Sequence, residues 1–310
     1  MYQTSNSVRK GIATFLAITF ALSSVFYFLI IWIGRLGAGR GLYVIGLMWC
    51  PGLAALLTCR LRRRSAAGLG WKWDTRYQLL SYLIPIAYAS VAYVAVWLTG
   101  LGKFPNGDFI KATAGEFGWE KLPTGLVITL YVLMAGTVGM VTNTASALGE
   151  EIGWRGFLVP ELAKATTYTK TALISGIIWS VWHYPILLFA DYNSGTPAWY
   201  GLTCFTVMVI GLSFAFAWLR LKSGSLWTGA FLHASHNLFI QAIFTPMTAD
   251  TGVTKYVIDE FGAALAVVAL IVAFIFWRRR SEVSGVQPST PPESLAQSEP
   301  LAADAVQQHI

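Results

Sequence analysis

Long apolar stretches constrain the fold of this chain more than any other feature of its sequence. A helix that crosses a hydrocarbon core ~30 Å thick needs about 20 apolar residues, and eight windows of this kind can be drawn. They are Gly11–Gly34, Leu42–Cys59, Gln78–Leu98, Thr124–Ala147, Thr171–Ala190, Tyr200–Leu221, Leu226–Phe244 and Phe261–Trp277. The composition agrees, because 12% of the 310 residues are charged, 55% are hydrophobic and the mean hydropathy is +0.56. We therefore expect an all-α, polytopic membrane protein with about eight transmembrane helices.

The Lys and Arg residues are divided unevenly between the two sides of such a bundle. Most of the 22 basic residues fall in loops on the side of the N-terminus, including the sequence RLRRR at residues 60–64. Since basic loops stay in the cytoplasm, both termini are predicted to be cytoplasmic, with the plasma membrane as the location in a prokaryote. The net charge of +7 and the pI of 9.3 therefore describe orientation and contact with anionic lipids of the bilayer. They do not imply a nucleic-acid partner.

The composition changes after Arg280, where Ser, Pro, Gln and acidic residues replace the apolar pattern. Such a segment cannot bury enough surface to offset the entropy that it loses on ordering. We predict one multi-span membrane domain over residues 1–280, with a motif-bearing core at 124–244, and a disordered cytoplasmic tail over residues 281–310. The chain shows no strong internal repeat, which weakens a transporter built from inverted halves.

Two adjacent carboxylates and an arginine follow the fourth window, in the sequence EEIGWR. On a helix, Glu151 and Arg155 lie four residues apart on one face with the acid first, so they can neutralise each other. Glu150 is rotated ~100° from that face and has no local counter-ion. A carboxylate partly removed from water is suited to act as a general base near neutral pH. The alternative is that all three are solvated charges at the membrane surface.

Three of the four histidines lie in apolar windows. His183 follows Trp179 by four residues and shares a helix face with it. His233 and Asn237 are also four apart, and they combine a proton-transfer group with an amide that can bind an oxyanion. Simpler explanations are a core histidine bonded to a backbone carbonyl for His183, and an interhelical link for the second pair. His236 flanks that pair, and it either supports the pair or is a packed core residue.

Ionisable side chains within membrane spans are energetically costly, so each is a functional candidate. The candidates here belong to three different parts of the chain and can converge in one place. Together they would supply a base, an orienting acid or base, and oxyanion donors, and hydrolysis is the natural reaction of such a set. We therefore expect the helices to enclose a polar intramembrane cavity.

At these residues the sequence resembles the CPBP family of intramembrane proteases, which takes its name from CAAX proteases and bacteriocin-processing proteins and includes the type II CAAX prenyl endopeptidases. The family motif Glu-Glu-x-x-x-Arg appears as EEIGWR, Phe-x-x-x-His appears as WSVWH, and His-x-x-x-Asn/Asp appears as HASHN. The resemblance covers Thr124 to Phe244. Trp179 departs from the Phe that is usual in the family, and we expect this other aromatic ring still to pack beside His183.

The resemblance implies an intramembrane endopeptidase in which Glu150 and His183 activate a water molecule. It also implies that His233 and Asn237 form an oxyanion hole. We expect no cofactor, because Asn237 is a natural oxyanion donor and a poor zinc ligand. The implied supporting residues are Glu151, Arg155 and Trp179. The implied substrate is a peptide or a membrane protein, with a lipidated C-terminus as one form of it. Cleavage is expected in the cytoplasmic half of the bilayer.

Two alternatives to this mechanism stay open. Glu150, His183 and His233 also form the ligand set of a hydrolytic zinc site, although Asn237 suits an oxyanion better than zinc. A non-enzymatic membrane scaffold or immunity-type protein would use the same residues to bind a partner or to hold helices together. Helix counting adds a difficulty, because at ~1.5 Å per residue His183 lies ~20 Å from the cytoplasmic end of its window, deeper than Glu150. One of the two helices must then be shifted, tilted or broken for these side chains to meet.

Overall fold

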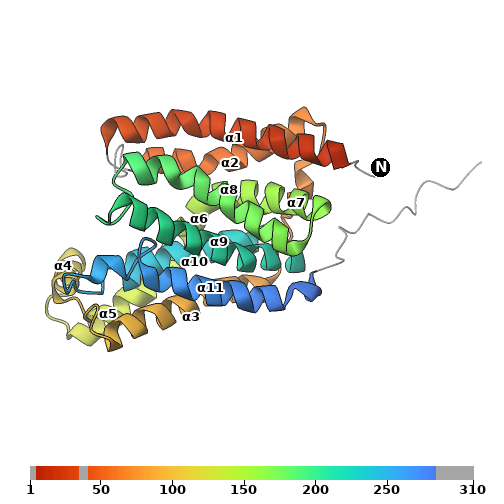
Figure 1. Ribbon diagram of the computed structural model, residues 1–310. Coiled ribbons are helices and arrows are strands. Elements are labelled where there is room, and N and C mark those ends of the chain that lie inside the picture. The colour runs from red at the N-terminus through yellow and green to blue at the C-terminus, as the bar shows by residue number, and fades with distance from the viewer. Residues whose placement is uncertain (1–4, 35–40, 284–310) are drawn as a thin grey trace, which may run out of the picture.

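The computed structural model describes residues 5–34 and 41–283, and the regular structure in these ranges is helical apart from one isolated β-bridge. The α-helices are α1 (Ser5–Ile33), α2 (Leu42–Leu61), α3 (Thr75–Leu98), α4 (Gly107–Phe117), α5 (Thr124–Met134), α6 (Met140–Glu151), α7 (Val159–Ala165), α8 (Tyr168–Phe189), α9 (Ala198–Ser223), α10 (Trp227–His236) and α11 (Ala263–Arg278). The π-helical segments are η3 (Ala135–Gly139), η4 (Ile152–Leu158) and η5 (Asn237–Phe244), and the 3₁₀ turns are η2 (Ala66–Leu69), η6 (Thr254–Tyr256) and η7 (Arg280–Glu282). The long helices lie side by side, with the short helix α4 at one end of the bundle (Figure 1).

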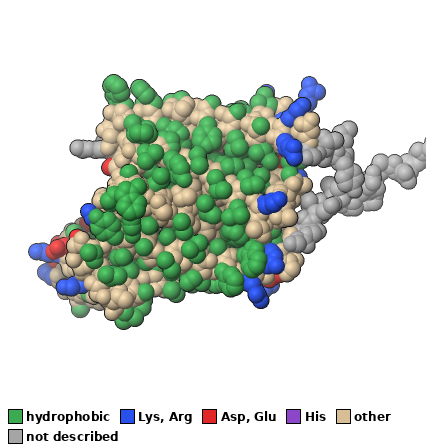
Figure 2. Space-filling model, in the orientation of Figure 1, with side chains coloured by type: hydrophobic (Ala, Val, Ile, Leu, Met, Phe, Trp, Pro, Cys, Tyr) green, Lys and Arg blue, Asp and Glu red, His purple; other side chains and the backbone are tan. Residues whose placement is uncertain are grey.

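Six helical runs in the described part of the chain are long and apolar enough to cross a membrane. They are Asn6–Ile33, Leu42–Leu61, Thr75–Leu98, Thr124–Ala165, Tyr168–Phe189 and Ala198–Ser223. Apolar side chains cover the face of the molecule seen in Figure 2, while Lys and Arg gather at its ends. Trp32, Leu98 and Val141 are at least 70% exposed, which suits contact with lipid and not with water. The chain is an integral, multi-pass membrane protein, as its sequence predicts.

The last two of the eight predicted windows are helical but do not meet the same criterion. Leu226–Phe244 folds as α10 followed by η5, and both of its histidines are buried in the interior. Phe261–Trp277 folds as α11, which has 16 residues, fewer than the about 20 that span a bilayer. Length and apolar character therefore identify six candidate spans among the described residues, and not eight.

The fourth predicted window, Thr124–Ala147, ends too early. It is the first part of a helical run of 42 residues, Thr124–Ala165, in which η3 and η4 interrupt the α-helical segments. At ~1.5 Å per residue this run is about 63 Å long, roughly twice the thickness of a hydrocarbon core. Turns of π-helix inside α-helices are frequent at functional sites. The sequence EEIGWR thus lies well inside a long helical run and not at the end of a span.

Glycines bring α6 close to α2 at the start of this polar motif. A Cβ atom on Gly149 would lie 2.7 Å from the Cα of Trp49 and 2.8 Å from the carbonyl oxygen of Met48. A Cβ atom on Gly52 would lie 2.5 Å from the carbonyl oxygen of Gly149. Small residues permit this backbone-to-backbone approach between membrane helices. Because Gly149 directly precedes Glu150, the same crossing sets the position of that carboxylate.

Gly149→Ala is expected to destabilise the protein by about 1–3 kcal/mol, because the added methyl group pushes α2 and α6 apart. Thermal unfolding in detergent measures the effect. Gly125→Ala is the matched control, since a Cβ on this glycine of α5 meets nothing within 4 Å. Equal Tm values for the two variants would contradict the packing argument.

The described beginning and end of the chain lie at the same end of the bundle (Figure 1). There Arg62 donates a hydrogen bond to the carbonyl oxygen of Ser7 at 2.9 Å, and Arg279 pairs with Glu282 at 2.8 Å. Of the predicted tail, residues 281–283 complete η7 and its last turn, and residues 284–310 lie outside the described residues. The predicted disorder of the tail therefore stays a prediction.

Candidate active site

A cavity of about 220 Å³ lies within the helical bundle. Its wall includes Glu150 from α6, Trp179 and His183 from α8, and His233 and Asn237 from α10 and η5. Much of the remaining wall is apolar, with side chains from α2 and α9 such as Leu47, Met48, Phe205, Met208 and Leu212. The candidate residues from three separate parts of the chain thus border one partly polar cavity, as the sequence predicts.

The expected difference in depth between Glu150 and His183 does not exist. The two helical runs follow each other through a short connection after Ala165. At ~1.5 Å per residue, Glu150 lies about 22 Å before the end of its run at Ala165, and His183 lies about 22 Å after the start of α8 at Tyr168. The two side chains reach the same level because the run that carries Glu150 continues beyond its predicted end.

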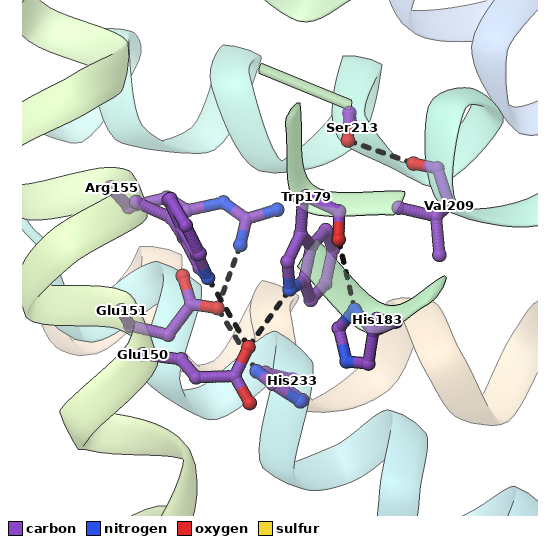
Figure 3. A network of polar contacts seen from close by, with 9 residues as sticks. Glu150, Glu151, Arg155, Trp179, His183, Val209, Ser213 and His233 are labelled. Carbon is purple, nitrogen blue, oxygen red and sulfur yellow. Dashed lines mark hydrogen bonds and ion pairs between the residues drawn. The ribbon is translucent and has the colours of Figure 1, made fainter. Parts of the chain in front are cut away.

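The carboxylate of Glu150 is held by two indole N–H groups. Its Oε2 atom accepts hydrogen bonds from Nε1 of Trp179 at 2.8 Å and from Nε1 of Trp154 at 3.2 Å (Figure 3). The residue is 2% exposed, and in the described part of the chain it has no ion pair. The predicted lack of a counter-ion agrees with this, while the two neutral donors were not foreseen. Such donors stabilise a buried carboxylate but, unlike a cation, do not neutralise its negative charge.

Glu151 binds both Arg155 and His233. Its Oε1 atom accepts from Nη1 of Arg155 at 2.7 Å, so the pair predicted from the spacing forms, and it also accepts from Nδ1 of His233 at 3.0 Å (Figure 3). The guanidinium of Arg155 lies 4.1 Å from the ring centroid of Trp179 and 3.6 Å from that of Phe216. Aromatic faces at these distances attract a cation. Glu151 therefore links a fixed cation to a cavity histidine.

His183 has one ring nitrogen bonded and the other available to the cavity. Its Nδ1 atom lies 2.9 Å from the carbonyl oxygen of Trp179, and because a carbonyl can only accept, Nδ1 carries the hydrogen. In the neutral imidazole Nε2 is then an acceptor, and within the described residues it has no hydrogen-bond partner. The rings of Trp179 and His183 pack edge to face, with their centroids 6.1 Å apart, as expected for two residues on one helix face. The alternative of a core histidine bonded to a backbone carbonyl thus explains the position of Nδ1 but not that of Nε2.

His236 belongs to a second polar network, which the sequence did not reveal. Its Nδ1 lies 2.5 Å from the hydroxyl of Tyr88, and its Nε2 lies 2.9 Å from Oε1 of Glu260, while the other carboxylate oxygen of Glu260 accepts from Tyr192. Burial raises the pKa of Glu260, but the hydrogen bonds from His236 and Tyr192 outweigh burial and hold it below the ordinary value. The adjacent acids Asp259 and Glu260, just before an apolar helix, were the available signal. Both ring nitrogens of His236 are engaged, so the network fastens the loop before α11 to the cavity wall.

The side chains considered as zinc ligands are not arranged as a metal site. Among the described residues, no three His, Cys, Asp or Glu side chains are grouped so that they could hold a metal ion. The Oε2 atom of Glu150 already accepts hydrogen bonds from two indole N–H groups. The donor set of Glu150, His183 and His233 therefore does not fit zinc in this arrangement.

Comparison with known proteins gives two matches. Residues 129–239, which include the candidate residues from Glu150 to Asn237, match the sequence profile of a family described as type II CAAX prenyl endopeptidase Rce1-like. A CAAX prenyl protease 2 from Methanococcus maripaludis is 25% identical over 198 residues. That alignment covers 62% of this chain and 65% of the relative, slightly less than two thirds of its length.

Proposed function

Because the chain belongs to the Rce1-like family of type II CAAX prenyl endopeptidases, we propose that it is an intramembrane endopeptidase that hydrolyses peptide bonds in the cavity. One observation carries the proposal. Among the described residues, the carboxylate of Glu150 is held by neutral donors alone, and it borders the same cavity as Nε2 of His183, which has no hydrogen-bond partner there. Two acceptors around a small polar space are suited to binding and deprotonating a water molecule.

In the first step Glu150 acts as the general base. A water molecule placed between its carboxylate and Nε2 of His183 gives a proton to the carboxylate, while the water oxygen attacks the carbonyl carbon of the scissile peptide bond. The hydrogen bonds from Trp154 and Trp179 hold one carboxylate oxygen and leave the other for the water. The carbonyl oxygen of the substrate takes the electron pair and becomes an oxyanion.

His233 and Asn237 stabilise that oxyanion. The amide of Asn237 supplies N–H donors, and His233 supplies its Nε2–H when the ring is protonated. The carboxylate of Glu151, at 3.0 Å from Nδ1 of His233, favours this protonated form. Arg155 pairs with the same carboxylate oxygen at 2.7 Å and holds it in place. When the intermediate collapses, the C–N bond breaks and the proton held by Glu150 passes to the leaving amine.

We propose the orientation predicted from the sequence, with both chain ends on the cytoplasmic side. Two observations support it: the described chain ends lie at one end of the bundle (Figure 1), and Arg62, from the basic sequence RLRRR, binds the carbonyl oxygen of Ser7 at that end. An even number of spans is then required. The six candidate spans of the described residues and the eight windows predicted from the sequence are both even numbers, so either count satisfies this requirement.

The proposed substrate is a peptide segment of a membrane protein or a lipidated C-terminus. The apolar wall formed by side chains such as Leu47, Met48 and Phe205 suits an apolar group next to the scissile bond. The name of the relative, a CAAX prenyl protease 2, supports the second form. A zinc-dependent protease and a non-enzymatic scaffold are the competing functions.

The proposal is tested by incubating detergent-purified protein with a library of fluorogenic peptides, with and without prenylated C-termini, in water enriched in ¹⁸O. Hydrolysis places one ¹⁸O atom in the new carboxyl group of each product, which mass spectrometry detects. A folded protein that cleaves no peptide would overturn the proposal and favour the scaffold.

Metal removal is expected to leave cleavage intact. Because the cavity donors do not form a ligand set, a strong zinc chelator should change kcat/KM by less than about twofold, whereas a metal-dependent hydrolase loses its activated water. Dialysis against the chelator, followed by the peptide assay, measures the effect. If the chelator abolished activity and added zinc restored it, the cavity residues would be metal ligands, and the metal-free mechanism would be wrong.

A further inference from the structure

Trp179 contacts four charged or titratable residues of the proposed site. Its indole N–H donates to Glu150 at 2.8 Å, and the face of its ring lies 4.1 Å from the guanidinium carbon of Arg155. Its backbone carbonyl binds Nδ1 of His183 at 2.9 Å, and its ring contacts that of His233 with 5.3 Å between centroids. The side chain is 6% exposed, so these contacts are shielded from water.

The contact with Glu150 requires tryptophan. A phenylalanine, the residue expected here from the family motif, could fill part of the same space and contact the same rings. It has no N–H group and could not donate to the carboxylate. Trp154 donates to the same oxygen from a longer distance, 3.2 Å, so loss of the Trp179 donor would leave Glu150 with one weaker bond. The departure from the motif therefore changes the surroundings of the proposed base.

We propose that Trp179 is a positioning residue whose indole N–H orients the carboxylate of Glu150 toward the reacting water. The inference rests on the proposed function. A hydrogen bond to an ionised carboxylate stabilises that form relative to the protonated one. The bond also holds Oε2 away from the reacting water, so that the remaining oxygen faces the cavity. The chain would then hydrolyse peptides at more acidic pH than the same chain with phenylalanine at this position.

The test compares pH profiles of kcat/KM for the wild type and for Trp179→Phe. The base must be ionised, so activity rises with pH along the acid limb. Loss of one charge-assisted hydrogen bond is expected to shift the acid limb to higher pH by about one unit. This shift lowers kcat/KM about tenfold on the limb and changes it little on the plateau. Trp97→Phe is the control, because it also removes an indole hydrogen bond, to Thr248 at 3.0 Å, away from the cavity. Its profile should match that of the wild type.

A second variant separates the hydrogen bond from packing. Replacing Trp179 by benzothienylalanine, in which sulfur takes the place of the indole N–H, keeps the ring size and removes only the donor. The same upward shift is expected. An acid limb that coincides with the wild type in both variants would overturn the inference, and so would an equal loss at every pH, which would assign Trp179 to packing. Absence of cleavage by the wild type would instead count against the proposed function itself.

Discussion

Glu150→Gln is expected to lower kcat/KM by about 10²–10⁴-fold without unfolding the protein, because the amide cannot take a proton from water. Glutamine keeps the shape of the side chain, and its amide oxygen can still accept from Trp154 and Trp179, which bind Oε2 of the wild-type residue. Buried polar groups therefore remain paired. The peptide assay measures kcat/KM, and thermal unfolding in detergent confirms that the variant is folded.

Glu116→Gln in α4 provides the matched control for this result. It makes the same chemical change at an exposed position, and Glu116 does not border the cavity. The control should retain wild-type activity. If Glu150→Gln cleaved peptides as fast as the control, Glu150 would not be the base, and the mechanism would have to rest on another group of the cavity.

Arg155→Met is expected to cost about 3–5 kcal/mol of stability, the effect of leaving one member of a buried ion pair without its partner. Glu151 is fully buried, and its Oε2 atom has no hydrogen-bond partner among the described residues. In the part of the chain that the structure describes, Arg155 is thus the only permanent cation paired with Glu151, at 2.7 Å. The methionine chain fills the space between the rings of Trp179 and Phe216 but supplies no charge. Denaturation in detergent measures the loss.

Lys222→Met is the control for Arg155→Met. The pair that it breaks has an N–O distance of 3.6 Å, and its two side chains are 32% and 35% exposed. Exposed pairs contribute only about 0–1 kcal/mol. The double variant Arg155→Met with Glu151→Gln should recover part of the lost stability, because it also removes the buried charge. Equal stability of Arg155→Met and Lys222→Met would refute the argument.

Contacts within one helix could be predicted from the sequence because helix geometry determines them. Residues four apart on an α-helix are neighbours whatever surrounds the helix. The pair of Glu151 with Arg155 and the contact of Trp179 with His183 are of this kind, and both are present. The membrane class likewise follows from apolar length, because a bilayer accepts few other spanning segments.

The length of the fourth span, Thr124–Ala165, could not be predicted in this way. A hydropathy window stops where charge begins, at the very motif that the folded protein buries. Glu150, Glu151 and Arg155 are at most 2% exposed, so the run continues past them to Ala165. Charged residues that are paired inside a bundle do not mark the end of a membrane helix.

The sequence by itself determined the class of the protein, its motifs and the contacts that one turn of helix creates. Only the tertiary structure decided that Trp179 donates to Glu150, that Glu151 holds His233, and that Glu260 fastens His236. These partners are separated by 29, 82 and 24 residues in the chain. They meet because different helices, and the loop before α11, pack together at particular positions, and this packing depends on backbone contacts such as that between Gly149 and α2. The spacing of Gly149 and Gly153 permits a close approach, but the helix that fills it is decided by two surfaces packed together, which no local pattern specifies.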